Sequence, residues 1–308
     1  MELSSIQHID PSHLSDFKAE VFITTLGYET RCTHVARQLE NLSCRKVALS
    51  STQCLKDFSY DENMEYFLSK EFEIVSIDSE VPDLEDILGS LTGENIGMMV
   101  DCTSMPPSWY YQFFKCFDEK QDFQGVVRMR IIYTMANYFG LDSSLKVKDI
   151  TNFLKADIKN SAKKKSALVL GLGHEKKICE SIYNIVDPDL LYLYYADPPV
   201  DKKYVELSFI NNHALIAATP IRNLISYPIR NGQAIYQSLI NTILPLRNDY
   251  SIVIIPYGPK IFSVVAMLIH LGYPDIRISY PSFKKPPAAD RSPSGEPVIL
   301  DILFEGEE

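Results

Sequence analysis

The 308-residue sequence has little of what marks several specialised protein classes. It contains only 6 cysteines and 13 glycines, too few for a disulfide scaffold or a collagen. Its longest apolar stretch, residues 262–271, falls far short of the ~20 residues that cross a bilayer. The N-terminal residues do not form a basic segment followed by an apolar one, so we expect no signal peptide. These absences predict a cytoplasmic protein that does not associate with membranes.

Familiar catalytic and cofactor motifs are also missing from the sequence. The cysteines form no C-x-x-C pair and have no histidine at zinc-ligand spacing, so we expect reduced thiols and no metal site. There is no P-loop, no G-x-S-x-G elbow and no zincin motif. Gly171 and Gly173 begin like a dinucleotide fingerprint, but its third glycine is absent and Glu175 would face the pyrophosphate. The sequence therefore predicts no cofactor.

The charge balance is acidic. Thirty Lys and Arg stand against forty Asp and Glu, a formal net charge of −10, which disfavours duplex nucleic acid as a partner. A local basic pocket for one small anionic ligand is compatible with this balance. The 46% hydrophobic and 23% charged residues are typical of a globular protein, and the length suggests two domains of roughly 100–200 residues.

Two similar loops indicate an internal repeat. Residues 26–31 read Leu-Gly-Tyr-Glu-Thr-Arg, and residues 172–177 read Leu-Gly-His-Glu-Lys-Lys, 146 positions later. Each loop follows a short apolar run and precedes apolar residues at helical spacing, so each is expected to join a strand to a helix. Matching loops at one fixed offset predict a duplicated unit.

Further segments recur in the same order. Residues 47–49 correspond to 193–195, residues 98–106 to 253–260, and residues 130–133 to 277–280. Short, wholly apolar strands that alternate with helices predict parallel sheets covered on both faces. We therefore predict an α/β protein of two tandem Rossmann-like domains related by internal duplication. The expected boundaries are residues 1–145, a linker at 146–166 that contains Lys163, Lys164 and Lys165, and residues 167–308, with a final strand at 298–304.

Candidate site residues follow from this fold, because open α/β sheets bind ligands beyond the carboxyl ends of the first and fourth strands. The loops at these places contain Gly27, Tyr28, Glu29, Arg31, Asp101, Thr103, Ser104 and Met105 in the first half, and Gly173, His174, Glu175, Lys177, Tyr257, Gly258 and Lys260 in the second.

The charges of these loops suit a nucleotide. Lys260, Arg31 and Lys177 would hold phosphate oxygens, and Asp101 or Glu29 would accept hydrogen bonds from a ribose or a base. A purely structural interpretation stays open, in which the glycines form tight turns and the acidic residues favour helix N-termini. A catalytic interpretation also stays open. Glu29 and Asp101 would then be the paired acids of an N-glycosidase or a phosphoribosyl-type transferase.

The tandem arrangement resembles the CRISPR-associated Rossmann fold (CARF) proteins and the related SAVED domains. Asp101, Cys102, Thr103 and Ser104 look like the D-x-T-G-G-T-K loop of that family, although the glycines and the lysine are absent. The resemblance implies a sensor of oligonucleotide second messengers in bacterial defence, with the ligand in the cleft between the two halves. Since the two halves use nearly the whole chain, the resemblance implies either a separate effector protein as partner or an activity in the protein's own cleft. A protein-interaction module without a small ligand is the remaining alternative.

Overall fold

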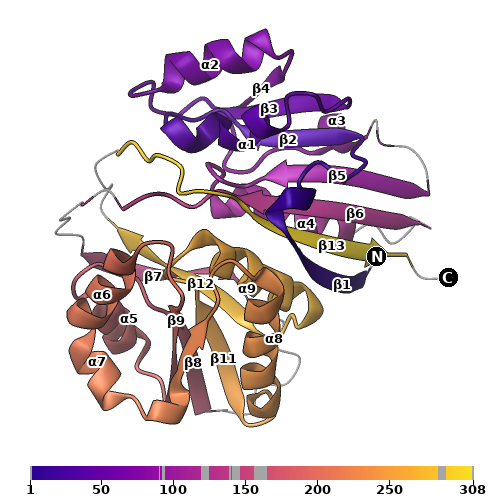
Figure 1. Ribbon diagram of the computed structural model, residues 1–308. Coiled ribbons are helices and arrows are strands. Elements are labelled where there is room, and N and C mark those ends of the chain that lie inside the picture. The colour runs from indigo at the N-terminus through magenta and orange to yellow at the C-terminus, as the bar shows by residue number, and fades with distance from the viewer. Residues whose placement is uncertain are drawn as a thin grey trace. The chain divides into compact units, whose positions relative to one another are not determined.

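The computed structural model describes residues 2–89, 91, 94–118, 125–138, 140, 146–155, 165–283 and 289–306. The chain divides into two compact units (Figure 1). Unit 1 comprises Met1–Asn137 and Ala289–Glu308, and unit 2 comprises Tyr138–Ala288. Within the described residues, unit 1 contains a seven-stranded sheet and unit 2 a six-stranded sheet.

Unit 1 alternates strands and helices along the chain. Its strands are β1 (Glu2–Ile9), β2 (Val21–Thr25), β3 (Arg45–Ser51), β4 (Glu73–Ile77), β5 (Asn95–Asp101), β6 (Val126–Tyr133) and β13 (Val298–Glu305). Its helical segments are η1 (Pro11–His13), η2 (Thr30–Thr33), α1 (His34–Gln38), α2 (Tyr60–Ser69), α3 (Glu85–Leu88) and α4 (Pro107–Asp118).

The sheet of unit 1 has the strand order of a Rossmann-like domain. The order is β1-β13-β6-β5-β2-β3-β4, and β2 to β6 run parallel. β3 and β4 lie on one side of β2, whereas β5 and β6, which come next in the chain, lie on its other side. The strand order therefore reverses between β2 and β5. This reversal is the topological switch point. The outer strands β13 and β1 are antiparallel to their neighbours.

Helices cover both faces of this sheet. On one face, Val35 of α1 and Phe67 of α2 pack in a cluster with Phe22 and Met99 of the strands. On the other face, Phe117 of α4 lies 6.1 Å, centroid to centroid, from Phe304 of β13. Every residue of β2 is buried, because a central strand covered on both faces has no solvent side.

Unit 2 repeats the alternation. Its strands are β7 (Val147–Leu154), β8 (Lys165–Gly171), β9 (Leu190–Ala196), β10 (Leu224–Tyr227), β11 (Tyr250–Ile255) and β12 (Arg277–Phe283). Its helical segments are α5 (Ile178–Val186), α6 (Lys202–Asn211), α7 (His213–Ala218), η3 (Ile221–Asn223), α8 (Gly232–Ile243), η4 (Leu244–Leu246) and α9 (Lys260–Gly272).

The sheet of unit 2 has the same central topology as that of unit 1. Its order is β10-β9-β8-β11-β12-β7, with β8 to β12 parallel and β7 antiparallel at the edge. Ile178 of α5 and Leu215 of α7 pack with Leu168 on one face. On the other face, the Tyr194 hydroxyl donates to the Ser238 carbonyl of α8 (3.1 Å). The switch point of this unit therefore lies between β8 and β11.

The predicted fold class is confirmed, since both units are Rossmann-like. The loop after β2 in unit 1 and the loop after β8 in unit 2, here called the first loop of each unit, leave their strands in the same way. The Leu26 amide donates to the Leu49 carbonyl (2.8 Å), and the Leu172 amide donates to the Tyr194 carbonyl (2.7 Å). These contacts match the two loops that the sequence aligned. Descent of both units from one duplicated ancestor stays a prediction.

The predicted domain boundaries differ from the observed units in two places. The final strand, β13, pairs with β6 in unit 1, although the sequence assigned it to the second domain. Residues 147–154 form β7 at the edge of the second sheet, inside the expected linker. β7 has a mixed, largely exposed sequence because it is an edge strand, so its composition resembled a linker. Lys163 and Lys164 lie outside the described residues, and Lys165 begins β8.

Arg130 fixes the C-terminal strand in unit 1. Its Nε and Nη2 donate to the two carboxylate oxygens of Asp301 on β13, both at 2.7 Å. Its Nη1 donates to the carbonyls of His13 and Leu14, and its guanidinium lies 4.6 Å from the centroid of the Phe17 ring. A buried guanidinium needs this many partners. The same side chain thereby ties the first and last segments of the chain to one sheet.

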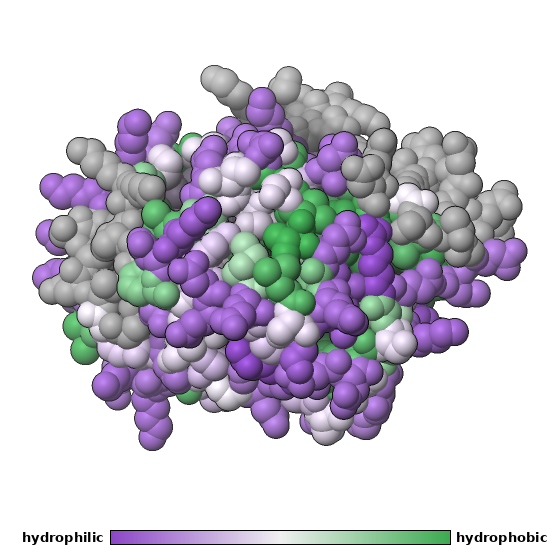
Figure 2. Space-filling model, turned by 90° about the horizontal axis from the view of Figure 1, so that it is seen from above, coloured by the Kyte–Doolittle hydropathy of each residue, from purple (hydrophilic) through white to green (hydrophobic). Residues whose placement is uncertain are grey.

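The surface is polar for the most part. Large hydrophobic side chains that are exposed among the described residues are Phe58, Leu68, Ile185, Ile210, Ile221 and Leu244. Figure 2 shows a face on which a hydrophobic patch is surrounded by hydrophilic residues. In the described part of the chain, no helix combines the length and the apolar character needed to cross a membrane.

A glycine in β5 is required by close packing, which gives a first prediction. A Cβ atom on Gly97 would lie 2.2 Å from the Lys18 carbonyl oxygen. We expect Gly97→Ala to lower the free energy of unfolding by about 1–3 kcal/mol, as overpacking of a core does, in urea unfolding experiments. Gly272→Ala, at the end of α9 with nothing within 4 Å of the new Cβ, is the matched control and should leave stability unchanged or slightly higher. Equal losses in both variants would contradict this account.

Candidate functional site

The two predicted loops of unit 1 meet at its switch point. β2 and β5 are hydrogen-bonded neighbours, and the loops that follow them approach closely. A Cβ atom on Gly27 would lie 3.5 Å from the Ser104 Cβ, so Gly27 is at an ordinary contact distance from the second loop. Tyr28 is half-buried, and its ring centroid is 5.8 Å from that of Phe58. The structure thus brings together the segments that the sequence paired.

Asp101 is wholly buried and holds the backbone at the end of β5. Its Oδ1 accepts a hydrogen bond from the Thr103 amide (3.0 Å), and its Oδ2 accepts one from the Thr24 hydroxyl (3.3 Å). The Thr103 hydroxyl in turn accepts from the Thr134 amide (2.9 Å), beyond β6. Met105 is also buried. These contacts give Asp101 a structural role in the turn after β5.

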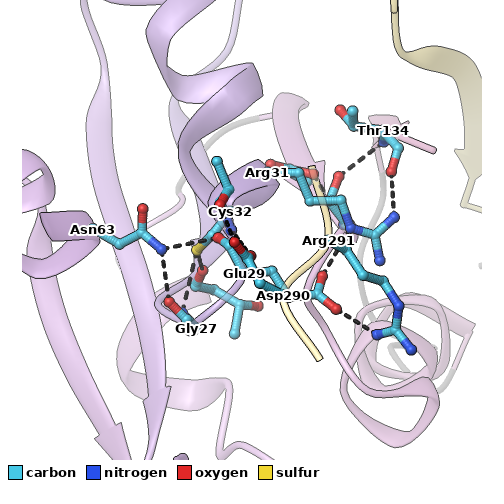
Figure 3. A network of polar contacts seen from close by, with 12 residues as sticks. Gly27, Glu29, Arg31, Cys32, Asn63, Thr134, Asp290 and Arg291 are labelled. Atoms are coloured by element: carbon cyan, nitrogen blue, oxygen red, sulfur yellow. Dashed lines mark hydrogen bonds and ion pairs between the residues drawn. The ribbon is translucent and has the colours of Figure 1, made fainter. Parts of the chain in front are cut away.

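Glu29 and Arg31 form a buried ion pair at the same edge of the sheet (Figure 3). The Arg31 Nε donates to Glu29 Oε2 (2.8 Å), and each residue is 6% exposed. The Arg31 Nη1 donates to the Thr134 carbonyl (2.8 Å). Burial disfavours the charged guanidinium, but neighbouring Tyr133 and Glu29 outweigh it and raise the pKa of Arg31. The second oxygen of Glu29, Oε1, accepts from Arg291 Nη1 (2.5 Å).

This network limits what the predicted residues of unit 1 can do. Both carboxylate oxygens of Glu29 hold guanidinium groups, and Asp101 is 0% exposed. A general acid or nucleophile must reach its substrate. The arrangement therefore gives no support to Glu29 and Asp101 as a catalytic pair. Arg31 was expected to hold a phosphate. Its guanidinium instead donates hydrogen bonds to Glu29 and to the Thr134 carbonyl.

The sequence did not predict the partners that complete this network. Asp290 accepts hydrogen bonds from Thr30, and Arg291 pairs with Glu29, although each pair is about 260 residues apart in the chain. The segment that carries them is rich in proline and serine. No periodicity or motif links it to the first loop. Only the unexpected strand order, with β13 in unit 1, brings it there.

A buried asparagine holds the first loop in each unit, which the sequence reading also missed. The Asn63 side-chain amide donates to the carbonyls of Gly27 (2.9 Å) and Glu29 (3.0 Å). In unit 2, the Asn212 side-chain amide donates to the Gly173 carbonyl (3.0 Å). Asn63 lies in α2, which follows β3, and Asn212 lies directly after α6, which follows β9. The two loops thus share their anchoring as well as their sequence.

A buried cysteine accompanies each of these loops. Cys32 donates from its thiol to the Thr25 carbonyl (2.8 Å), and its sulfur accepts from the Gly27 amide (3.2 Å). Burial raises the pKa of Cys32 and of Cys179 to about 12, although the amides of Gly27 and Gly173, respectively, act in the opposite direction. Both thiols are therefore neutral packing groups at neutral pH.

The two predicted loops of unit 2 also meet at its switch point. A Cβ atom on Gly173 would lie 2.4 Å from the Tyr257 ring, and one on Gly258 would lie 3.2 Å from the Leu172 carbonyl oxygen. Glycine at both positions lets the loops pack directly on each other. Burial and the hydrogen-bonded carboxylate of Glu175 raise the pKa of Tyr257. Glu175 thus has a phenol as partner where Glu29 has two guanidinium groups.

Half-buried aromatic rings lie beside the first loop of unit 2. The His174 ring centroid is 5.0 Å from that of Tyr204 and 6.2 Å from that of Tyr138. The two tyrosine rings are 5.4 Å apart and nearly perpendicular. The Lys203 ammonium lies 5.6 Å from the Tyr138 ring centroid. All three rings keep part of their surface exposed.

Basic residues adjoin this aromatic cluster. Lys176 and Lys177 are exposed on the loop, and Lys260 is the partly buried first residue of α9. Lys177 adopts φ +65°, in the left-handed region that favours glycine. Gly258 is exposed between Tyr257 and α9. Unit 2 therefore presents cations, aromatic rings and an accessible backbone at its switch point, whereas the charged groups of unit 1 are buried in internal pairs.

Across the part of the chain that the structure describes, no three His, Cys, Asp or Glu side chains are grouped so that they could hold a metal ion. His174 Nε2 lies 3.7 Å from Glu175 Oε1, a single pair within the aromatic cluster.

Comparisons with known proteins identify no relative. No family model matches the chain, and no curated protein matches it. Among solved structures, the chain is similar to an N-terminal ketoreductase from the macrolactin assembly line, with 11% sequence identity, coverage of 82% of this chain and 63% of that chain, and a TM-score of 0.19. Since the chain spans less than two thirds of the ketoreductase and the TM-score is this low, the likeness bears on neither fold nor function.

The asparagine anchors give a second prediction. In Asn63→Asp and Asn212→Asp the carboxylate cannot donate to the loop carbonyls, so buried acceptors lose their partners. We expect each variant to lose about 1–3 kcal/mol of unfolding free energy in urea unfolding followed by circular dichroism. Asn248→Asp, at an exposed position before β11, should change stability by much less. If Asn248→Asp loses as much unfolding free energy as Asn63→Asp and Asn212→Asp, the added charge and not the lost donor is responsible.

The buried thiols give a third prediction. An unfolded thiol titrates near pH 9.0, whereas Cys32 and Cys179 have folded pKa values of about 12. Their contribution to stability is therefore complete below pH 9 and is lost as the pH rises from 9 to 12, by up to about 1.4 kcal/mol per thiol per pH unit. Urea unfolding between pH 8 and 10.5 should show a shallower decline for the Cys32→Ala, Cys179→Ala double variant than for the wild type. Parallel declines would refute the assignment.

Proposed function

We propose that unit 2 binds a nucleotide or a short oligonucleotide at the loops after β8 and β11. The observation that carries this proposal is the group of half-exposed aromatic rings, with lysines beside it, at the switch point of a Rossmann-like sheet. Ligands of such sheets bind at this position. The proposal concerns binding, because Glu29 and Asp101, the pair that was considered as catalytic acids, are buried away from any substrate.

The aromatic cluster would bind the base. His174, Tyr204 and Tyr138 already contact each other edge to face and keep ring surface exposed. Bases stack on such rings with about 1–3 kcal/mol per base and little dependence on sequence. Lys203 beside Tyr138 adds a cation to the same surface.

The lysines and the exposed glycine would bind phosphate. Lys177 is exposed on the first loop, and Lys260 begins α9 directly after Gly258. Ammonium groups form charge-assisted hydrogen bonds with phosphate oxygens. A glycine between them lets a phosphate approach the backbone closely, as in other nucleotide-binding loops of this topology.

The ligand we propose is small and acts as a signal. A net charge of −10 on the chain disfavours a long polyanion as ligand. The resemblance to the CARF and SAVED sensors favours an oligonucleotide second messenger of bacterial defence, read out by a separate effector protein. Both of these features belong to the proposal and rest on that resemblance.

A glycine substitution tests this proposal without straining the fold. Lys177→Gly removes the ammonium group and relieves the left-handed conformation at φ +65°. We expect the variant to be as stable as the wild type and to bind 5′-phosphorylated triadenylate and ATP about tenfold more weakly, the loss of one charge-assisted contact. Isothermal titration calorimetry measures both affinities.

Two further variants complete the test. Tyr204→Leu should weaken ATP binding but change the binding of tripolyphosphate, which has no base, by less than twofold. Arg222→Ala removes an exposed charge in η3, just before β10 and therefore at the amino ends of the parallel strands. This variant should change neither affinity. If the wild type binds neither triadenylate nor ATP, or if Lys177→Gly and Arg222→Ala behave alike, unit 2 does not bind nucleotides in this way.

A further inference from the structure

A segment of the chain crosses the switch point of unit 1. Residues 289–295, here called the strap, precede β13 and contact the loop after β2. The Thr30 amide donates to Asp290 Oδ1 (2.7 Å), and the Thr30 hydroxyl donates to Asp290 Oδ2 (2.5 Å). The Arg31 amide donates to the Arg291 carbonyl (3.1 Å), and the Arg291 side chain reaches Glu29. Figure 3 shows Asp290 and Arg291 beside Glu29 and Arg31.

The other end of the strap contacts the segment after β6. The Asn137 amide donates to the Ser292 carbonyl (3.0 Å), and the Asn137 side-chain amide donates to the Pro293 carbonyl (2.9 Å). The Ser294 amide donates to the Met135 carbonyl (2.8 Å). The strap is therefore fixed at two places on the carboxyl edge of one sheet.

These two places lie on opposite sides of β5. In the sheet, β5 is between β2 and β6, so a segment that contacts the loop after β2 and the residues after β6 must pass the end of β5. That position is the crevice in which Rossmann-like domains bind their ligands. In unit 1, the strap passes this position, and its Asp290 and Arg291 contact Thr30 and Glu29 of the loop after β2.

Two buried hydroxyls at the same carboxyl edge of the sheet lack partners in the described part of the chain. The hydroxyls of Thr25, at the end of β2, and of Thr134, after β6, are buried without a hydrogen-bond partner among the described residues. The Thr134 carbonyl meanwhile accepts from Arg31. Buried hydroxyls without partners are rare, and they mark places where a further group completes the bonding.

The strap itself is held by contacts that can open. Between Ala289 and Gly295 no side chain is fully buried, and the contacts named above are hydrogen bonds and an ion pair. Segments with few buried apolar contacts and partly exposed hydrogen bonds open at a small fraction of the global unfolding free energy. Glu29 keeps its bond to Arg31 when Arg291 leaves, so opening does not strand the buried carboxylate.

We propose that the strap is an autoinhibitory segment. It closes the switch-point crevice of unit 1, with Asp290 in the place of an anionic ligand group, and unit 1 binds a nucleoside phosphate only when the strap leaves. The class of ligand rests on the function proposed for unit 2, whereas the closure rests on the contacts of the strap. In the closed state only unit 2 is available, so the chain binds one nucleotide.

Removing the two closing side chains tests this inference. In Asp290→Ala, Arg291→Ala the strap loses its contacts with Thr30 and Glu29. We expect the wild-type chain to bind one ATP and the double variant to bind two, measured by equilibrium dialysis with radiolabelled ATP. Amide hydrogen exchange of residues 29–34 should become at least tenfold faster in the double variant without ATP, and slow again with it.

Matched variants separate this outcome from other effects. Asp249→Ala, Arg222→Ala removes the same two charges at exposed positions directly before β11 and β10 and should bind one ATP. Asp290→Asn, which keeps the size of the side chain, provides a milder opening if the double variant does not fold. The inference is overturned if opening the strap leaves the number of sites unchanged, even where exchange accelerates. A wild type that binds no ATP, with a double variant that binds one, would instead reject the function of unit 2 and support the strap.

Discussion

The buried ion pair of Glu29 and Arg31 is the interaction on which the carboxyl edge of unit 1 depends. Transfer of two charges from water costs several kcal/mol per ion, and only good geometry and further hydrogen bonds offset that cost. Here the Thr134 carbonyl and Arg291 supply those bonds. The pair therefore requires that the loop after β2 and the end of β6 remain in place, whereas the strap adds a contact that can leave without stranding Glu29. Loss of Glu29 or of Arg31 itself would leave an uncompensated buried charge, with a cost of about 3–5 kcal/mol.

The two units share the arrangement of the first loop but differ in the charged groups around it. In each, an asparagine and a cysteine fix the glycine of the first loop, so the loop backbone is set before any ligand arrives. In unit 1 the acidic residue of that loop is neutralised by guanidinium groups within the chain. In unit 2 the corresponding Glu175 bonds to Tyr257, and the neighbouring lysines and aromatic rings stay accessible. One topology thus supports a closed edge in one unit and an open edge in the other.

The sequence predicted the fold class and the location of the loops because both depend on local patterns. Short apolar strands identify parallel sheets, and the repeated Leu-Gly-aromatic-Glu segment identifies the first loop in each unit. What it could not predict depends on distant partners. β7 was taken for a linker because an edge strand is polar, and β13 was assigned to the wrong unit because strand pairing leaves no mark on composition. Arg291, which decides the environment of Glu29, lies 262 positions away, where no periodicity connects the two. The catalytic roles considered for Glu29 and Asp101 gain no support because both side chains are buried. Their burial depends on the tertiary structure, which local sequence patterns do not show.

The central claim is that the accessible site of this protein is the switch point of unit 2. Photoaffinity labelling of the full chain with 8-azido-ATP, followed by peptide mapping, tests it most directly. The account predicts labelled peptides that contain His174 or Tyr204, with protection by excess ATP. Labelling of residues 26–31 or 102–105 in the wild type, with unit 2 unlabelled, would contradict it.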